Sequence, residues 1–90
     1  MKRYAAAVTG AVQGVGFRWG VVRLAETLGA TGWVRNEPDG SVTLEVQADS
    51  PALLRFFEGL PHCARWARVD GVERTRLPLA EGEPGFRVRY

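Results

Sequence analysis

The chain has 90 residues, enough for one domain with a modest core, since 46% of its residues are hydrophobic. No apolar run approaches the ~20 residues of a membrane-spanning helix, and residues 1–4 begin no signal peptide. We therefore expect a single cytoplasmic domain over residues 1–90 with no membrane partner. The net charge of +2 and a pI near 9.2 suit a small anionic partner.

The first third of the chain predicts a strand followed by a helix. Residues 4–12 alternate between two faces, and their small side chains suit a central strand packed closely by helices. Residues 17–28 place apolar side chains every three or four positions, as one face of a helix requires. These side chains are Phe17, Val21, Leu24 and Leu28. Gly29 is the expected C-cap of this helix, and we expect Trp19 to pack.

Two further strands are predicted to form a hairpin. Residues 31–36 form the first strand, Asp39-Gly40 is a strong turn signal, and residues 41–48 form the second strand. Apolar and polar side chains alternate strictly over residues 41–48, which predicts a sheet with one buried and one exposed face. The apolar set is Val42, Leu44, Val46 and Ala48, and the polar set is Thr43, Glu45 and Gln47.

The last part of the chain predicts a second helix and two more strands. Asp49 and Pro51 mark the start of the helix. Its expected apolar side chains are Leu53, Leu54, Phe57 and Leu60. Residues 67–77 form the next strand, with a bulge expected around Asp70-Gly71. After a loop over residues 78–85, the alternation of Phe86, Val88 and Tyr90 with arginines predicts a short final strand.

This order, β-α-β-β-α-β plus a short C-terminal strand, is that of an α+β, ferredoxin-like α/β sandwich. We expect an antiparallel sheet with two helices on one face. In this topology the first and second strands run parallel on either side of the third, so their carboxyl ends share one edge, roughly 10 Å apart. The loop after residue 12 and Asn36 are therefore predicted neighbours in space.

Three glycines in seven positions, Gly10, Gly14 and Gly16, separate the first strand from the first helix. Glycines let a backbone turn sharply and approach a ligand, and N–H groups at a helix N-terminus attract anions. Neither common nucleotide fingerprint fits, because the dinucleotide pattern needs glycine at Trp19 and the Walker pattern needs it at Val15. The loop therefore predicts either a cradle for a small anion such as phosphate or a plain turn.

Two motifs in the chain resemble those of the acylphosphatase family. Residues 12–18 (VQGVGFR) match most of the family's glycine signature, and residues 32–36 (GWVRN) match a second motif downstream. The resemblance covers nearly the whole chain and extends to Tyr90. Ala11 stands where the family often has Arg, which removes one cation near the loop.

The resemblance implies hydrolysis of the carboxyl–phosphate bond of small acyl phosphates, giving a carboxylate and inorganic phosphate. It implies that Arg18 binds the phosphoryl group and that Asn36 orients the attacking water. The implied phosphate cradle is the loop formed by Gln13, Gly14, Val15, Gly16, Phe17 and Arg18. Such chemistry needs mainly positioning and charge stabilisation. We expect a monomer that needs no metal and no cofactor.

The remaining reactive residues give no competing site. One His, one Cys and scattered carboxylates show no metal-ligand spacing. His62 is adjacent to Cys63 in a helical pattern, so the two side chains point apart. We therefore interpret Cys63 as a small structural hydrophobe rather than a nucleophile.

Other interpretations remain open from the residues alone. Arg18 by itself can be a solvated helix arginine, and Asn36 can cap the turn before Glu37-Pro38. Trp33 is expected to pack on the sheet. The alternative function is a non-catalytic, ferredoxin-like module that binds an anion or nucleic acid. RNA-binding sheets carry aromatic and basic residues on their third strand, whereas this one carries the polar set listed above, so we expect no nucleic-acid partner.

Overall fold

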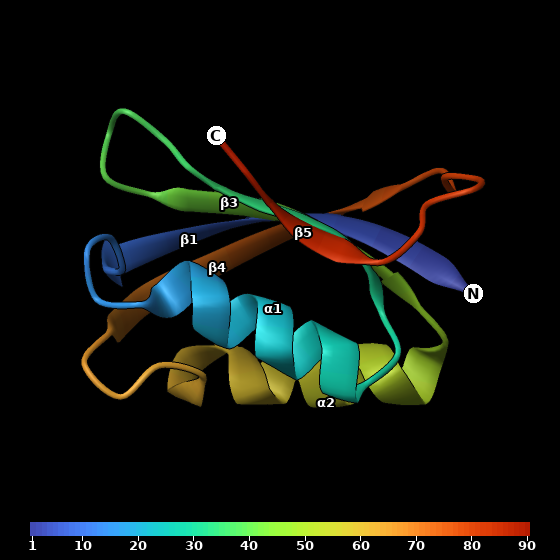
Figure 1. The fold of residues 1–90 in the computed structure, drawn as a ribbon, viewed down its shortest axis with the longest axis horizontal. Helices are drawn as coiled ribbons and strands as arrows, with labels where there is room; N and C mark the ends of the chain where they lie inside the picture. Colours follow the sequence, from blue (N-terminus) through green and yellow to red (C-terminus); the bar gives the residue numbers. More distant parts are fainter.

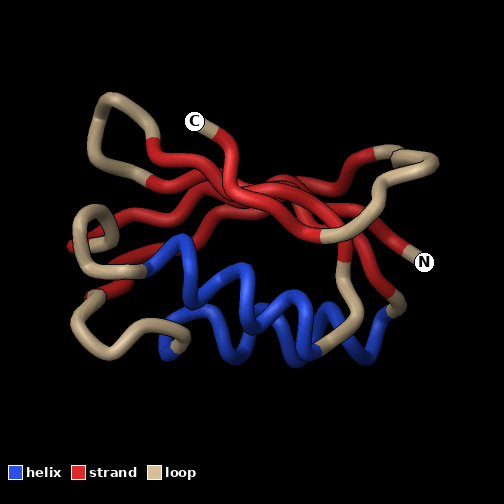
Figure 2. Tube along the Cα trace, viewed as in Figure 1, coloured by secondary structure: helices blue, strands red, loops and turns tan.

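The computed structural model describes residues 1–90 as a five-stranded sheet with two helices on one face (Figures 1 and 2). In chain order the elements are β1 (Lys2–Ala11), α1 (Phe17–Thr27), β2 (Thr31–Asn36), β3 (Val42–Ala48), α2 (Ser50–Gly59), the 3-10 turn η1 (Leu60–His62), β4 (Arg68–Leu77) and β5 (Phe86–Arg89). The strand order is β4-β1-β3-β2-β5. This is the predicted α+β arrangement with its additional C-terminal strand. Neither helix is long and apolar enough to cross a membrane.

One strand pair departs from the expected antiparallel sheet. β1 and β2 each run antiparallel to β3, which lies between them, so β1 and β2 point in the same direction as predicted. β4 occupies the edge beside β1, and the chain then crosses to the other edge and enters β5 parallel to β2. Val88 lies opposite Val34, and Arg89 lies opposite Arg35. The carboxyl ends of β1, β2 and β5 therefore all lie at the same end of the sheet, where these strands stop.

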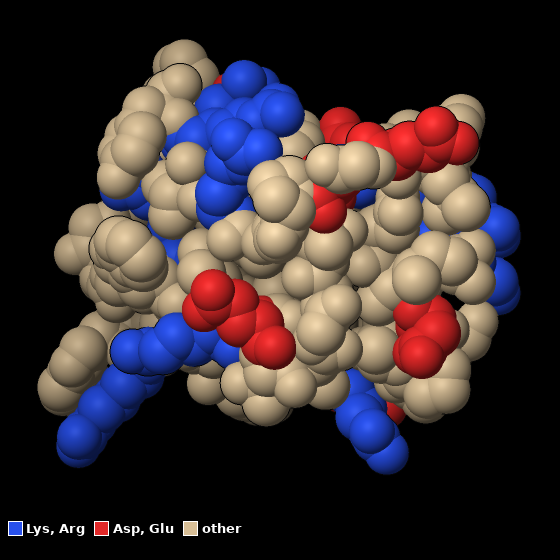
Figure 3. All heavy atoms as spheres, turned by 45° about the vertical axis from the view of Figure 1, so that its right-hand side comes forward, with Lys and Arg blue, Asp and Glu red and all other residues tan.

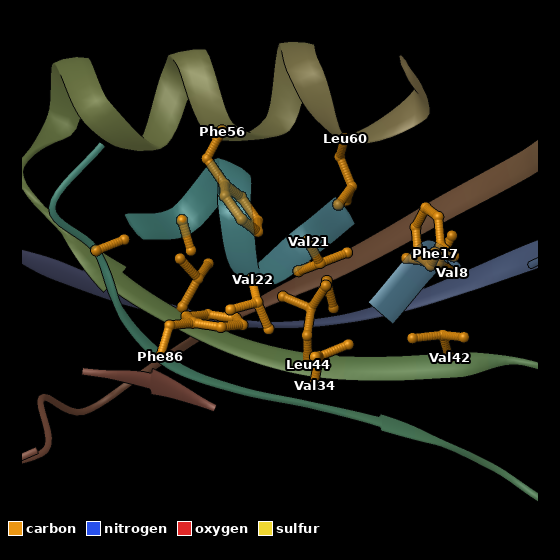
Figure 4. Close-up of a cluster of buried hydrophobic side chains, with 14 of the residues drawn as sticks. Val8, Phe17, Val21, Val22, Val34, Val42, Leu44, Phe56, Leu60 and Phe86 are labelled. Carbon is orange, nitrogen blue, oxygen red and sulfur yellow. The ribbon is translucent and has the colours of Figure 1, made fainter. Parts of the chain in front are cut away.

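The core lies between the helices and the facing side of the sheet (Figure 4). The alternation predicted within β3 is confirmed, because its apolar side chains are buried and its polar ones lie on the other face. Figure 4 shows Phe56 of α2, Leu60 of the following turn η1 and Val21 of α1 on the helix side of this layer, with Leu44 and Val34 on the sheet side. Burying a large apolar side chain contributes ~1.5–3 kcal/mol, so this layer supplies much of the stabilisation of the fold.

The buried face of α2 differs from the predicted one. Phe56 is fully buried whereas Leu54 is 63% exposed, so the prediction that Leu54 faces the core was wrong. Leu53, Phe56 and Leu60 are spaced by three and four residues and form one helical face. Leu54 lies about 100° around the helix from Leu53 and therefore points toward solvent.

Local signals set the helix ends. The Asp49 carboxylate accepts a hydrogen bond of 2.9 Å from the Ala52 N–H at the start of α2, as predicted for a capping residue. α1 ends at Thr27 with Leu28 as its C-cap, so the predicted cap Gly29 follows one residue later, in the left-handed region with φ 68°. The Ala30 N–H then donates back to the last turn of α1 at 2.9 Å. This closing turn sends the chain directly into β2.

A bulge in β4 lies where it was predicted. The pairing of β1 with β4 shifts between Thr9 and Gly10, which face Gly71 and Val69, so Asp70 is the extra residue. Gly10 has φ 127°, and a Cβ atom at this position would overlap the backbone of β4. The first of the three glycines thus serves strand pairing, and only the other two belong to the loop.

Candidate functional site

The segment between β1 and α1 turns on two glycines. Gly14 and Gly16 have φ values of 74° and 76°, which glycine adopts without strain. Gly16 is the N-cap of α1, and no side chain caps this helix. The backbone N–H groups of residues 14–18 donate to no other backbone group. Together with the positive end of the helix dipole, these N–H groups attract an anion.

Gln13 holds this loop to the turn between β2 and β3. Its side-chain Nε2 donates to the carbonyl oxygen of Glu37 at 2.7 Å and to that of Ser41 at 2.9 Å. These two residues flank the turn and are joined by a hydrogen bond from the Glu37 N–H to the Ser41 carbonyl. The side chain of Gln13 is therefore a clamp between the loop and the strand end. Only its backbone is available to the predicted phosphate cradle.

Asn36 ends β2 on the side of the sheet that faces the helices. It pairs with Val42 of β3, which also pairs with Val8 of β1. Side chains two residues apart share a face, so Asn36 lies on the same face as the buried Val34. Its Oδ1 atom is buried and has no hydrogen-bond partner, so it does not cap the turn. A buried amide oxygen without a partner is uncommon and leaves an acceptor for a bound molecule.

Arg18 lies in the first turn of α1, with its side chain turned toward the C-terminus of the chain. Its guanidinium lies over the ring of Tyr90, with Cζ 5.3 Å from the ring centroid. Arg89 of β5 lies opposite Arg35 of β2 in the parallel pair. Tyr90 follows Arg89 and Asn36 follows Arg35, so Tyr90 and Asn36 lie at the same end of the sheet. Cation–π stacking thus holds the Arg18 side chain near the strand end that carries Asn36. This role of Tyr90 is absent from the sequence-based prediction.

Two residues of the predicted cradle have side chains that pack elsewhere. Phe17 is buried in the core, and Val15 packs against the margin of the core. Their contribution to an anion site is limited to backbone N–H groups. Arg18 is the only cationic side chain between residues 13 and 18, so it provides the formal positive charge of this loop.

Ionised carboxylates stabilise the turn beside the site. Hydrogen bonds from the Thr43 hydroxyl and the Arg35 guanidinium lower the pKa of Glu37. The Ser41 hydroxyl and backbone N–H donate to Asp39 and lower the pKa of that carboxyl as well. Both groups are ionised at neutral pH: Glu37 bonds to the two strands that flank the turn, and Asp39 bonds within the turn. Their role is to fix the shape of the turn that Gln13 grips.

Metal-ligating and nucleophilic side chains do not gather at this edge. No three His, Cys, Asp or Glu side chains form a group that could hold a metal ion. Cys63 packs against the core, and burial raises the pKa of its thiol to about 11. The thiol therefore stays protonated at neutral pH and is a poor nucleophile. The groups available for chemistry at the candidate site are backbone N–H groups, one guanidinium and one amide.

Trp19 does not pack as predicted. Its side chain is 62% exposed. Two helical positions correspond to about 200°, so Trp19 points away from the core that the buried Phe17 faces. The indole instead lines a groove between α1 and β5 together with Tyr90.

Comparison with known proteins gives a consistent assignment. The acylphosphatase family model matches residues 4–88. An acylphosphatase from Salinibacter ruber is 48% identical over 88 residues, which cover 98% of this chain and 93% of the relative. The crystal structure of acylphosphatase from Bacillus subtilis matches with a TM-score of 0.95 and 33% identity over 100% of both chains. That of an acylphosphatase from Coxiella burnetii matches with a TM-score of 0.89 and 34% identity, covering 98% of this chain and 92% of the other. The chain therefore belongs to the acylphosphatase family.

Proposed function

We propose that this chain is an acylphosphatase that hydrolyses the carboxyl–phosphate bond of small acyl phosphates. One observation carries the proposal: Asn36 Oδ1 is buried without a partner at the edge where the glycine loop and Arg18 also lie. An acceptor in this position can hold a water molecule against a phosphoryl group bound by the loop. Membership of the family supports the same activity.

The phosphoryl group binds to the backbone N–H groups of residues 14–18 and to Arg18. The planar guanidinium donates to two phosphoryl oxygens at once, and the N–H groups stabilise the charge on these oxygens during the reaction. The stacking of Arg18 on Tyr90 restrains the guanidinium before substrate binds. Less side-chain entropy is then lost on binding.

Asn36 positions the nucleophile. A water molecule donates a hydrogen bond to Asn36 Oδ1, which directs the water oxygen toward phosphorus. The water oxygen bonds to phosphorus while the bond from phosphorus to the acyl oxygen breaks, and the carboxylate leaves with that electron pair. The proton of the water passes to a phosphoryl oxygen, because an amide does not accept it at neutral pH. No step of this proposal uses a metal ion or a cofactor.

All groups in this proposal come from one chain, so the proposed active form is a monomer. Sedimentation at the protein concentration of the activity assay checks this, and a site active only in a larger assembly contradicts it. The cytoplasmic location expected from the sequence stays a prediction, which imaging of the tagged protein in its host checks.

Release of inorganic phosphate from acetyl phosphate, measured with and without EDTA, tests the activity. We expect hydrolysis that EDTA does not affect. A folded chain that binds phosphate but hydrolyses no acyl phosphate is a silent anion binder, and this result overturns the proposal. Loss of activity with EDTA, restored by a divalent metal, overturns the metal-free mechanism.

Two substitutions separate the proposed roles of the side chains. Arg18→Lys keeps the charge but loses the bidentate fork, so we expect kcat/KM to fall ~100-fold or more and phosphate to inhibit more weakly. Asn36→Ala should lower kcat ~100-fold with little change in the inhibition constant of phosphate. Arg55→Lys, on the exposed side of α2, is the matched control. Equal losses in turnover and phosphate affinity for Asn36→Ala contradict a water-positioning role.

Two observations argue against the nucleic-acid-binding alternative. Trp33 lies on the open face of the sheet but is covered by Arg35 and Arg89, whose Cζ atoms lie 5.4 and 4.7 Å from its ring. The indole is therefore not free to stack on a base. Basic and acidic side chains both occupy the face drawn in Figure 3, so no continuous basic stripe crosses it. Tight binding of single-stranded RNA at moderate salt would revive this alternative.

A further inference from the structure

The outer side of β4 is the longer of the two free edges of the sheet. β4 has 10 residues and pairs with β1 on one side only, whereas β5, at the other edge, has 4 residues. After the bulge at Asp70, residues 71–77 form an unbroken ladder with β1. An edge strand presents backbone N–H and C=O groups that can pair with a further strand. Residues 71–77 therefore offer a regular edge for strand addition.

A groove of about 370 Å³ lies between this edge and α2. Its lining residues are Leu54, Phe57, Glu58, Val72 and Arg74. A second hollow of about 160 Å³ adjoins it, because Leu54, Phe57 and Arg74 line both. Leu54 is 63% exposed, and Phe57 beside it is half-buried. An exposed leucine next to an aromatic ring, in a groove under a free strand edge, is an apolar surface that a side chain from outside can cover.

Two exposed arginines of β4 stand over this groove. The guanidinium of Arg74 lies over the Phe57 ring, with Cζ 4.5 Å from the ring centroid. That of Arg76 lies over the Tyr4 ring at 5.9 Å. The β1 partners of these arginines, Ala6 and Tyr4, contact the core, so both arginines lie on the helix side of the sheet. A guanidinium stacked on a ring keeps its in-plane N–H groups available for a carboxylate.

A second copy of this chain does not suit the edge. When residues 71–77 of two copies pair antiparallel around a two-fold axis, directly opposite residues share a face, so Arg74 meets Arg74, Arg76 or Val72. The first two registers place like charges opposite each other, and the third places Glu73 opposite itself. Like charges directly opposite destabilise a sheet. The charge pattern therefore favours an acidic partner over a second copy.

We propose that this edge binds an extended acidic segment of a partner protein, which adds to the sheet as a strand antiparallel to β4. Backbone hydrogen bonds hold the segment, and its side chains give specificity. The residues opposite Arg76 and Arg74 are acidic, and the residue opposite Val72 is apolar and enters the groove beside Leu54. Because alternate residues of a strand face the same side, the segment reads acidic-x-acidic-x-apolar from its N-terminus. This inference does not depend on the proposed function.

A capped, fluorescent peptide, Ser-Glu-Thr-Glu-Lys-Leu-Ser, tests the proposal in an anisotropy titration with the full chain. Its glutamates match the two arginines, its leucine matches the groove, and its lysine falls opposite Glu73. We expect saturable binding that weakens as salt is raised. The peptide Ser-Thr-Glu-Lys-Leu-Glu-Ser has the same composition but places its glutamates on opposite faces, so it should bind more weakly. Amide hydrogen exchange in β4 should slow in the complex, because strand addition occupies the free edge.

Substitutions locate the contact. Arg74→Ala and Arg76→Ala should each weaken binding of the first peptide about 2- to 5-fold. Leu54→Ser should weaken it about 3- to 10-fold through lost apolar contact. Arg87→Ala is the matched control, because it removes an exposed arginine from the other edge strand, and it should leave binding unchanged. Urea unfolding checks that each variant is folded.

Three results would overturn the proposal. Equal binding of the two peptides, or equal binding by wild type and Arg74→Ala, contradicts recognition of spaced carboxylates. Binding without slower amide exchange in β4 contradicts strand addition. Absence of binding at low salt means that Arg74 and Arg76 only protect the edge from pairing, as charged side chains do on other edge strands.

Discussion

Replacing Gln13 with alanine removes the side chain that ties the glycine loop to the turn after β2. Its Nε2 makes two hydrogen bonds, of 2.7 Å to the Glu37 carbonyl and 2.9 Å to the Ser41 carbonyl. A hydrogen bond of this kind contributes ~1 kcal/mol net, and water replaces part of it in a half-buried position. We therefore expect Gln13→Ala to lower the free energy of unfolding by ~1–2 kcal/mol.

The same substitution should affect catalysis more than stability. Asn36 precedes the turn that Gln13 grips, while Arg18 follows the loop that carries Gln13. Loss of the clamp lets the water-positioning amide and the phosphate-binding groups move apart, and a misplacement of about 1 Å can cost ~100-fold in rate. We expect a 10- to 100-fold lower kcat with acetyl phosphate and a small change in the inhibition constant of phosphate.

Gln47→Ala provides the matched control for this experiment. Gln47 also ties a loop to the sheet, through hydrogen bonds with the carbonyl and N–H of Ala80 at 3.0 and 2.9 Å. It lies at the opposite end of β3 from the turn. Gln47 also accepts a hydrogen bond of 3.2 Å from the buried Arg3, so urea unfolding should show at least as large a loss of stability in Gln47→Ala, with a loss of kcat only in Gln13→Ala. An unchanged kcat in Gln13→Ala, or an equal loss in Gln47→Ala, refutes the positioning argument.

Two further predictions concern stability. The guanidinium of the buried Arg3 donates to Glu83 at 2.9 and 3.1 Å and lowers the pKa of that carboxyl below its ordinary 4.5. The ion pair of Arg3 with Glu83 stabilises the folded chain above pH 4.5 and is lost as the pH falls and Glu83 becomes protonated. The free energies of unfolding in urea of the wild type and of Glu83→Gln should therefore converge in acid. Glu58→Gln, at an exposed site without an ion pair, should show no such convergence. Phe56→Ala should cost ~3–5 kcal/mol and Leu54→Ala under ~0.5 kcal/mol; equal costs contradict the observed face of α2.

The elements that the sequence predicted well are those whose side-chain pattern reflects a single buried face. β3 alternates strictly because one of its faces is buried in the core beneath the helices and the other is partly exposed to solvent. The shared edge of β1 and β2 follows from topology, and their common partner Val42 confirms it. The roles of Arg18 and Asn36 come from the family motifs and stay predictions for the assays described above.

The features that the sequence did not predict depend on contacts between distant segments. The clamp of Gln13 joins residues 24 and 28 positions away, and no local periodicity encodes such a bond. The stacking of Arg18 on Tyr90 requires β5 to lie beside β2, a pairing that alternation within β5 does not specify. Trp19 was assigned to packing from its hydrophobic character, although its helical position opposite Phe17 was a signal of exposure.

Folding of this chain has to bring together segments that are far apart in the sequence. β1 is a central strand, yet Tyr4 lies opposite Val46 in β3 and opposite Arg76 in β4. Closing such long loops costs chain entropy before the contacts form, so we expect refolding to be slow for a chain of this length, in milliseconds to seconds. During synthesis, β1 waits for its β4 partner until residue 77 has left the ribosome. Until then one side of β1 lacks its partner strand, although β3 can already pair with the other side, and Tyr90, which stacks on Arg18, has not yet been made.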